Sequence, residues 1–260
     1  INVNKCEITD KNYLDCLQTI FDKETCGKII KEISKYSKDD FVKARYCKVA
    51  YAIAVFFKND IKSFLFLTNI SLNVNLDFNS KCINNIFNCI NPIGEKGCWH
   101  TLDGSVEKFE RTKQIINQKL KSGKKVFVIS TYQTLGAGQN LQYEFNPKYE
   151  NDLKTINDNN YNNDKKDFQA IFLDKPTNMF VNMNTNQNEE QLLKFIYQVK
   201  CLEEKGQFNL EQATIEIKKA IKIFYHASAN KIATPRSKHI YMHTAKIIMQ
   251  AIGRICRTNI

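Results

Sequence analysis

The stretch KKVFVISTYQTLGAGQNLQ, residues 124–142, decides the fold that we expect for this chain. It opens with an apolar, β-branched run at residues 126–129, which is typical of a buried strand in a parallel sheet. Ser130 and Thr131 end the run, and a Gly-x-Gly-x-Asn loop follows at residues 136–140. Small hydroxyls, free N–H groups and glycines that allow close backbone approach favour phosphate recognition. A tight strand-to-helix turn, with glycines chosen for positive φ, explains the same residues equally well.

A second informative segment is QAIGRICRT at residues 250–258. Arg254 and Arg257 stand three positions apart, so in a helix both guanidinium groups lie on one face and can reach a single anion. Arginine is permanently charged, and its planar fork suits phosphate better than lysine does. An isolated pair of this kind is more often solvated surface, so its meaning depends on the segment upstream.

Together the two segments resemble the second, C-terminal RecA-like lobe of superfamily 2 helicases and translocases of the DEAD/DEAH type. Residues 130–142 look like helicase motif V, and residues 250–258 look like motif VI, with the family pattern Q-x-x-G-R-x-x-R. Residues 63–69 resemble the motif IV strand that opens this lobe, and residues 100–105 resemble a short loop before a helix that carries Arg111. The resemblance implies an α/β fold, a RecA-like doubly wound parallel sheet with helices on both faces.

The resemblance also implies roles for individual residues. Arg257 would be the arginine finger of ATP hydrolysis, and Arg254 would be a further contact near the γ-phosphate. The remaining ATP-binding positions would be Gln250, Gly253, Gly138 and Asn140. Many family members have Asp where Asn140 stands, which leaves a ribose contact by this side chain open. The nucleic-acid contacts would come from Thr68, Asn69, Ser130, Thr131 and Gln133.

The sequence lacks the signatures of a first helicase lobe. It has no G-x-x-x-x-G-K-[ST] phosphate loop, and no Asp-Glu pair follows an apolar strand. We therefore expect an excised part of a longer polypeptide, whose first lobe would be its partner. In that full-length protein, ATP would bind between the lobes and Mg²⁺ would be held by the absent first lobe. We expect the 260 residues alone to be inactive.

The amino-acid composition indicates which class of binding partner to expect. The formal net charge of +11 and the pI near 9.1 favour polyanions, either DNA or RNA and preferably a single strand. A genome biased toward lysine, asparagine and isoleucine would explain part of the same excess. Nine cysteines without a C-x-x-C pair, and no signal peptide, indicate reduced thiols in the cytoplasm and no metal site. No apolar run is long enough for a membrane span.

Patterning along the chain predicts two parts. Residues 1–60 form a helical lead-in that packs on the lobe, and residues 61–260 form the lobe, with a helical insertion at about 143–248. We expect strands at 63–69, 124–129 and 169–174, and helices at 40–57, 78–90, 106–120, 189–205, 210–228 and 240–257. The polar segment 146–166 is expected to be a loop. The insertion's lysines and aromatics suit either nucleic-acid contact or an amphipathic pair with a solvated face.

Two functions fit these observations. The first is the C-terminal motor lobe of an ATP-hydrolysing helicase or translocase that acts on nucleic acid. The second is a non-enzymatic nucleic-acid-binding or assembly module that keeps a RecA-like fold without the chemistry. Replacing Arg257 separates the two, because only the first requires it for ATP turnover.

Overall fold

The computed structural model describes residues 12–70, 72, 78–91, 97–102, 106–132, 134, 142–144, 165–174, 188–204, 206–226 and 238–255. The chain divides into two compact units. The first comprises residues 1–175 together with 251–260, and the second comprises residues 176–250. Each unit is described by itself below.

The first unit is built on a parallel sheet of four strands, in the order β2-β3-β1-β6. These strands are β1 (Ser63–Thr68), β2 (Gly97–Leu102), β3 (Lys125–Thr131) and β6 (Ala170–Leu173). β1 pairs with β3 so that Thr68 lies beside Thr131, and with β6 so that Leu67 lies beside Leu173. β1 is buried along its whole length, as is β3 up to Ser130, because both of their faces are covered.

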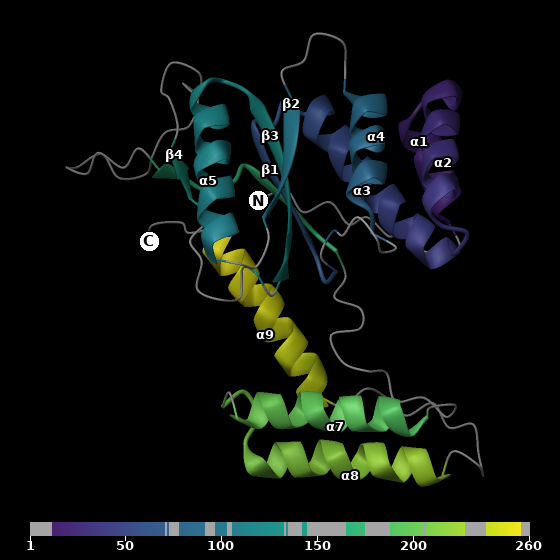
Figure 1. The fold of residues 1–260 in the computed structure, drawn as a ribbon, viewed down its shortest axis with the longest axis vertical. Helices are drawn as coiled ribbons and strands as arrows, with labels where there is room; N and C mark the ends of the chain where they lie inside the picture. The colour runs from purple at the N-terminus through teal and green to yellow at the C-terminus, as the bar shows by residue number, and fades with distance from the viewer. Residues whose placement is uncertain are drawn as a thin grey trace, which may run out of the picture. The chain divides into compact units, whose positions relative to one another are not determined.

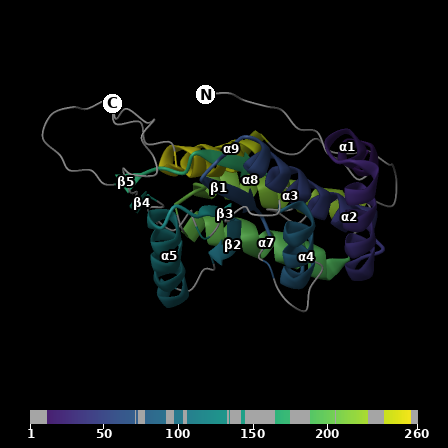
Figure 2. The same ribbon diagram turned by 90° about the horizontal axis from the view of Figure 1, so that it is seen from above.

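Helices lie on both sides of this sheet (Figure 1; Figure 2 shows it from above). α5 (Val106–Lys121) packs against β2 and β3, whereas α3 (Asp40–Lys58) contacts β1 and also α4 (Ser80–Ile90). The α/β class expected from the sequence is therefore confirmed. α5 ends before Gly123, whose φ of 77° is the left-handed conformation that stops a helix, as expected.

The N-terminal helices belong to the same unit. α1 (Tyr13–Ile20) and α2 (Lys23–Tyr36) precede α3, and α2 contacts α4. The carboxylates of Asp22 and Asp39 accept backbone N–H bonds at the starts of α2 and α3, which fixes where each helix begins. Most of the region before residue 60 is thus helical, as the apolar spacing predicts.

Phenylalanines form the centre of the core on the α3 side of the sheet. The rings of Phe64 and Phe127 stack with centroids 5.1 Å apart, and Phe66 and Phe172 stack at 4.9 Å. Phe56 of α3 meets Phe127 edge-on at 5.6 Å. Because side chains alternate along a strand, the intervening residues of β1 and β3 face the α5 side and are also buried: Leu65, Leu67, Val126 and Val128.

The second unit contains a helical hairpin of α7 (Glu189–Glu204) and α8 (Leu210–His226). Its core is small, with Phe195, Val199 and Phe208 beside two alanines. Gly206 turns the chain with a φ of 65°. Asn209 caps α8 reciprocally with Gln212, since each side chain accepts the other's backbone N–H. The expected helix, its glycine stop and the Asn209 cap are confirmed.

The final helix, α9 (Lys238–Ile255), agrees with the expected helix at 240–257 over residues 240–255, and residues 256–257 lie outside the described part of the chain. Its residues up to Gln250 are counted with the second unit, and those from Ala251 with the first. Along the chain this helix therefore belongs to both units.

Two expectations about loops are wrong. Residues 100–102 are not part of a loop, because they complete the edge strand β2, whose mixed sequence GCWHTL lacks the apolar run of an interior strand. Residues 165–166 form β5 (Lys165–Lys166), which pairs antiparallel with β4 (Tyr143–Glu144). The backbone pairing of such a two-residue strand leaves no periodic signal in the sequence. Residues 146–164 lie outside the described part of the chain.

Candidate functional site

The carboxyl edge of the sheet collects the polar residues of three strands. Thr68 ends β1, Thr131 ends β3 in register with it, and Asp174 directly follows β6. Ligands of open α/β sheets bind at this edge, outside the carboxyl ends of the strands. The structure thus brings Thr68, Asn69, Ser130 and Thr131, all expected as nucleic-acid contacts, to one edge of one sheet.

The hydroxyls at this edge differ in accessibility. Thr68 is 1% exposed and Ser130 is 2% exposed. The Ser130 hydroxyl donates to the Leu102 carbonyl at 3.2 Å, which ties β3 to the end of β2. Thr131 is half-buried, and its Oγ1 accepts the backbone N–H of Thr134 at 3.1 Å. That bond ties Thr134 back to the end of β3.

Asp174 links three elements at the same edge. Its backbone N–H donates to the Leu67 carbonyl at 2.9 Å, and its own carbonyl accepts the Tyr132 hydroxyl at 2.7 Å. Its carboxylate forms an ion pair with Lys48 Nζ of α3 at 2.8 Å. The side chains of Lys48 and Asp174 are only 21% and 9% exposed, so water screens the pair little. The ends of β1, β3 and β6 are thereby fixed to one another and to α3.

Burial also shapes the chemistry of Tyr132. Burial first, and the negative charge of Asp174 second, raise the pKa of its hydroxyl. Tyr132 therefore remains a neutral hydrogen-bond donor at physiological pH. Its role at this edge is to hold the end of β3 against Asp174.

Lys48 and Tyr132 were not expected as site residues from the sequence. Asp174 carried a signal, because a carboxylate that directly follows an apolar strand marks the carboxyl edge of a sheet. Lys48 carried none, since it stands 126 residues from Asp174 and only the tertiary fold brings the two together.

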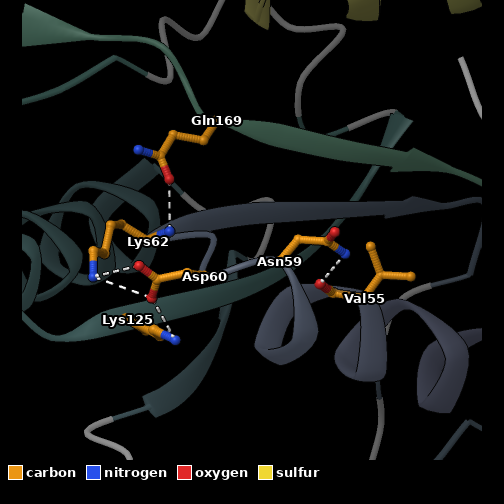
Figure 3. A network of polar contacts seen from close by, with 6 residues as sticks. All are labelled: Val55, Asn59, Asp60, Lys62, Lys125 and Gln169. Carbon is orange, nitrogen blue, oxygen red and sulfur yellow. Dashed lines mark hydrogen bonds and ion pairs between the residues drawn. The ribbon is translucent and has the colours of Figure 1, made fainter. Parts of the chain in front are cut away.

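The opposite, amino edge of the sheet is closed by a structural network (Figure 3). Asp60 forms ion pairs with Lys125 at 2.9 Å and with Lys62 at 3.3 Å. The hydrogen bond from Lys125 is the main cause that lowers the pKa of Asp60. The backbone N–H of Lys62 donates to Gln169 Oε1 at 2.6 Å. These bonds join the starts of β1, β3 and β6, so we assign this edge to the fold rather than to a ligand.

The remaining expected site residues lie in or beyond α9 and in the glycine loop. Gln250 is an exposed residue of α9, and the backbones of Gly253 and Arg254 lie in the same helix. Arg257, Gln133, Gly138 and Asn140 lie outside the described residues, as does the Arg254 side chain. The joint action of the two arginines on one anion remains a prediction.

A scan of protein-family models and a search of curated proteins each give no match for this chain. No helix within the described ranges is both long and apolar enough to cross a membrane.

One buried thiol of the first unit, that of Cys82, is unreactive at physiological pH. Burial raises the pKa of Cys82 to about 12, which keeps this thiol protonated. No group of three or more metal-binding side chains occurs among the residues that the structure describes.

The surface of the first unit also has an open hollow, which is lined by Tyr36, Ser80, Lys81, Asn84, Asn85 and Trp99. Within it the Trp99 Nε1–H donates to Asn84 Oδ1 at 3.2 Å.

Proposed function

We propose that this chain is the second motor lobe of an ATP-dependent helicase or translocase that acts on nucleic acid. The four-stranded parallel sheet would be part of a RecA-like doubly wound fold, and the protein would work in the cytoplasm on a single strand of DNA or RNA. One observation carries the proposal. The strands that end in the motif IV-like and motif V-like residues are neighbours in the sheet, and Thr68 lies in register with Thr131.

This pairing supports a shared contact surface for two segments 63 residues apart in sequence. In the proposal, Thr131 and the backbone of residues 69 and 131 touch the sugar-phosphate chain at the carboxyl edge. Ser130 and Thr68 are too buried for direct contact, so they would hold the strand ends in place. Asp174, Tyr132 and Lys48 would position the same edge through the contacts described above.

The chemical role of the chain would come from its C-terminal arginines. Arg257 would neutralise charge that develops on the transferring phosphoryl group, with Arg254 beside it. Gln250, Gly253, Gly138 and Asn140 would line the second lobe's side of an ATP cleft whose other side is the first lobe. Mg²⁺ would be held by that first lobe, so this chain by itself would not hydrolyse ATP.

The test is Arg257→Ala in the polypeptide that includes the first lobe. We expect nucleic-acid-stimulated ATP turnover to fall by about 10³-fold or more, with strand binding unchanged. Lys31→Ala is the matched control, because it removes one positive charge from an exposed position on α2. Unchanged turnover in Arg257→Ala would favour the alternative, a binding or assembly module without the chemistry. Rapid ATP hydrolysis by the 260 residues alone would also contradict the proposal.

A further inference from the structure

We propose that the outer face of α8 is a binding surface for single-stranded nucleic acid, formed by Lys218, Ile221, Lys222 and Tyr225. The proposal names a second contact region for the partner of the proposed function, and rests on that function only in the choice of partner. This surface, called the α8 stripe below, lies in the second unit, apart in sequence from the sheet's carboxyl edge.

The helical period places the four residues of the stripe together. Positions separated by three, four and seven residues share one face of a helix, and 218, 221, 222 and 225 have this spacing. The hairpin core takes a different face of α8, through Ala213, Ile217 and Ala220. The stripe therefore lies outside this core, with Ile221 at its border, and Lys218 and Lys222 are both exposed.

Charge distinguishes this stripe from the rest of the hairpin. α7 carries four glutamates and two lysines, whereas residues 217–226 of α8 carry three lysines and no acidic residue. Both lysines of α7 are paired, Lys194 with Glu190 and Lys200 with Glu203. On α8 only Lys219 has a carboxylate, that of Glu216, and it lies outside the stripe. No carboxylate within the described ranges lies within ion-pair distance of Lys218 or Lys222.

Two features of the stripe are unfavourable without a partner. Lys218 and Lys222 stand four residues apart, where like charges repel each other on a helix. Tyr225 is 71% exposed and Ile221 is 37% exposed, so an aromatic ring and an apolar side chain meet water beside the two lysines. A favourable position near the helix C-terminus accounts for Lys222, but not for Lys218, two turns before the end of α8, nor for the exposed ring beside them.

Single-stranded nucleic acid matches both features at once. Its phosphates would bind the two ammonium groups, and an unstacked base would lie on the face of the Tyr225 ring. Phe224 already contacts this ring edge-on, with centroids 5.4 Å apart, which orients it. An acidic protein would satisfy the lysines but would not need an exposed aromatic face.

The experiment measures binding of the 260-residue chain to a fluorescein-labelled oligothymidylate of about 20 nucleotides across a salt gradient. We expect Lys218→Gln with Lys222→Gln to weaken binding about tenfold at low salt. The slope of log affinity against log salt should fall by about 1.4, because each phosphate contact on a single strand contributes about 0.7. Lys194→Gln with Lys200→Gln is the matched control, since it removes the same charge from the other helix of the hairpin.

Tyr225→Ala tests the stacking contact separately. It should weaken binding about fivefold or more without changing the salt slope, because it removes no charge. Equal losses in the α7 and α8 lysine variants would overturn the proposal, as would an absence of binding by the unmodified chain. Displacement of the strand by poly-glutamate, with no effect of Tyr225→Ala, would reassign the stripe to acidic partners. None of these outcomes depends on Arg257, so failure here and failure of the proposed motor function are distinguishable.

Discussion

In the sheet-bearing unit, phenylalanines from α3, β1, β3 and β6 stack on one another in a core that also takes in α1, α2 and α4. In the α7–α8 hairpin, the described residues contribute five buried members to the core, two of which are alanines. The first unit also has an ion pair between distant elements, whereas the ion pairs between described residues of the hairpin lie within single helices. Most of the folding free energy should therefore reside in the first unit, which leaves the hairpin free to carry an exposed surface.

The largest expected effect is on stability, and it distinguishes the core of the first unit from that of the hairpin. Phe127→Ala should lower the free energy of unfolding by about 3–5 kcal/mol, since it removes a fully buried ring from the centre of the phenylalanine stack. Urea unfolding followed by the single tryptophan, Trp99, reports on this unit, because its indole packs against the same core. Phe195→Ala in the hairpin should leave the Trp99 transition unchanged and reduce only the helical signal. A shift of the Trp99 transition in Phe195→Ala would mean that the two units unfold together.

The next comparison concerns ion pairs. Lys48→Met should destabilise the first unit by about 2–3 kcal/mol, because it leaves the Asp174 carboxylate nearly buried without a cation. Adding Asp174→Asn should restore part of the loss. Lys200→Met, which breaks an exposed pair in the hairpin, should cost less than about 1 kcal/mol. Equal effects of the two lysine substitutions would contradict the structural role that we assign to Lys48.

Alanine substitutions at two glycines should have smaller costs in stability, and for different physical reasons. A Cβ on Gly97 would lie 2.8 Å from two carbons of the Phe57 ring, so Gly97→Ala should cost about 1–3 kcal/mol by overpacking. Phe57→Leu in the same chain should relieve part of that loss. Gly206→Ala meets no atom within 4 Å but forces alanine to a φ of 65°, which should cost about 1 kcal/mol of local strain in the hairpin. We assign the cost at Gly97 to steric overlap and the cost at Gly206 to backbone conformation. If trimming a side chain near residue 206 restored the stability lost in Gly206→Ala, that assignment would be wrong.

The smallest effect is the pH dependence from His100 on β2. Burial first, and the charge of Lys119 second, lower the pKa of His100, and its buried Nε2 has no hydrogen-bond partner in the described structure. The unfolded chain takes up a proton below its pKa of about 6.5, whereas the folded chain resists it, so stability falls as the pH drops through this value. Urea midpoints above and below that pH should differ less in His100→Leu than in the unmodified chain. An identical pH dependence in both proteins would exclude His100 as the cause.

The sequence predicted elements best where one periodic signal dominated. The interior strands β1 and β3 are continuous apolar runs, and the ends of α5 and α7 are marked by Gly123 and Gly206 in left-handed conformation. The edge strand β2 was missed because its residues before Leu102 are only half-buried and its mixed sequence contains no apolar run. For the site, the polar ends of β1 and β3 were predicted, but their accessibility was not, since Ser130 donates to a neighbouring strand that the sequence had placed in a loop.

What the sequence alone determined is the α/β class, the principal helices and interior strands, and the residues that stand at the ends of those strands. These follow from local periodicity and from turn chemistry, which neighbouring residues encode. Only the tertiary structure decided that β1 lies between β3 and β6, and that Lys48 meets Asp174 at the carboxyl edge. Strand order and such distant pairs depend on how the whole chain packs, and no local pattern encodes them.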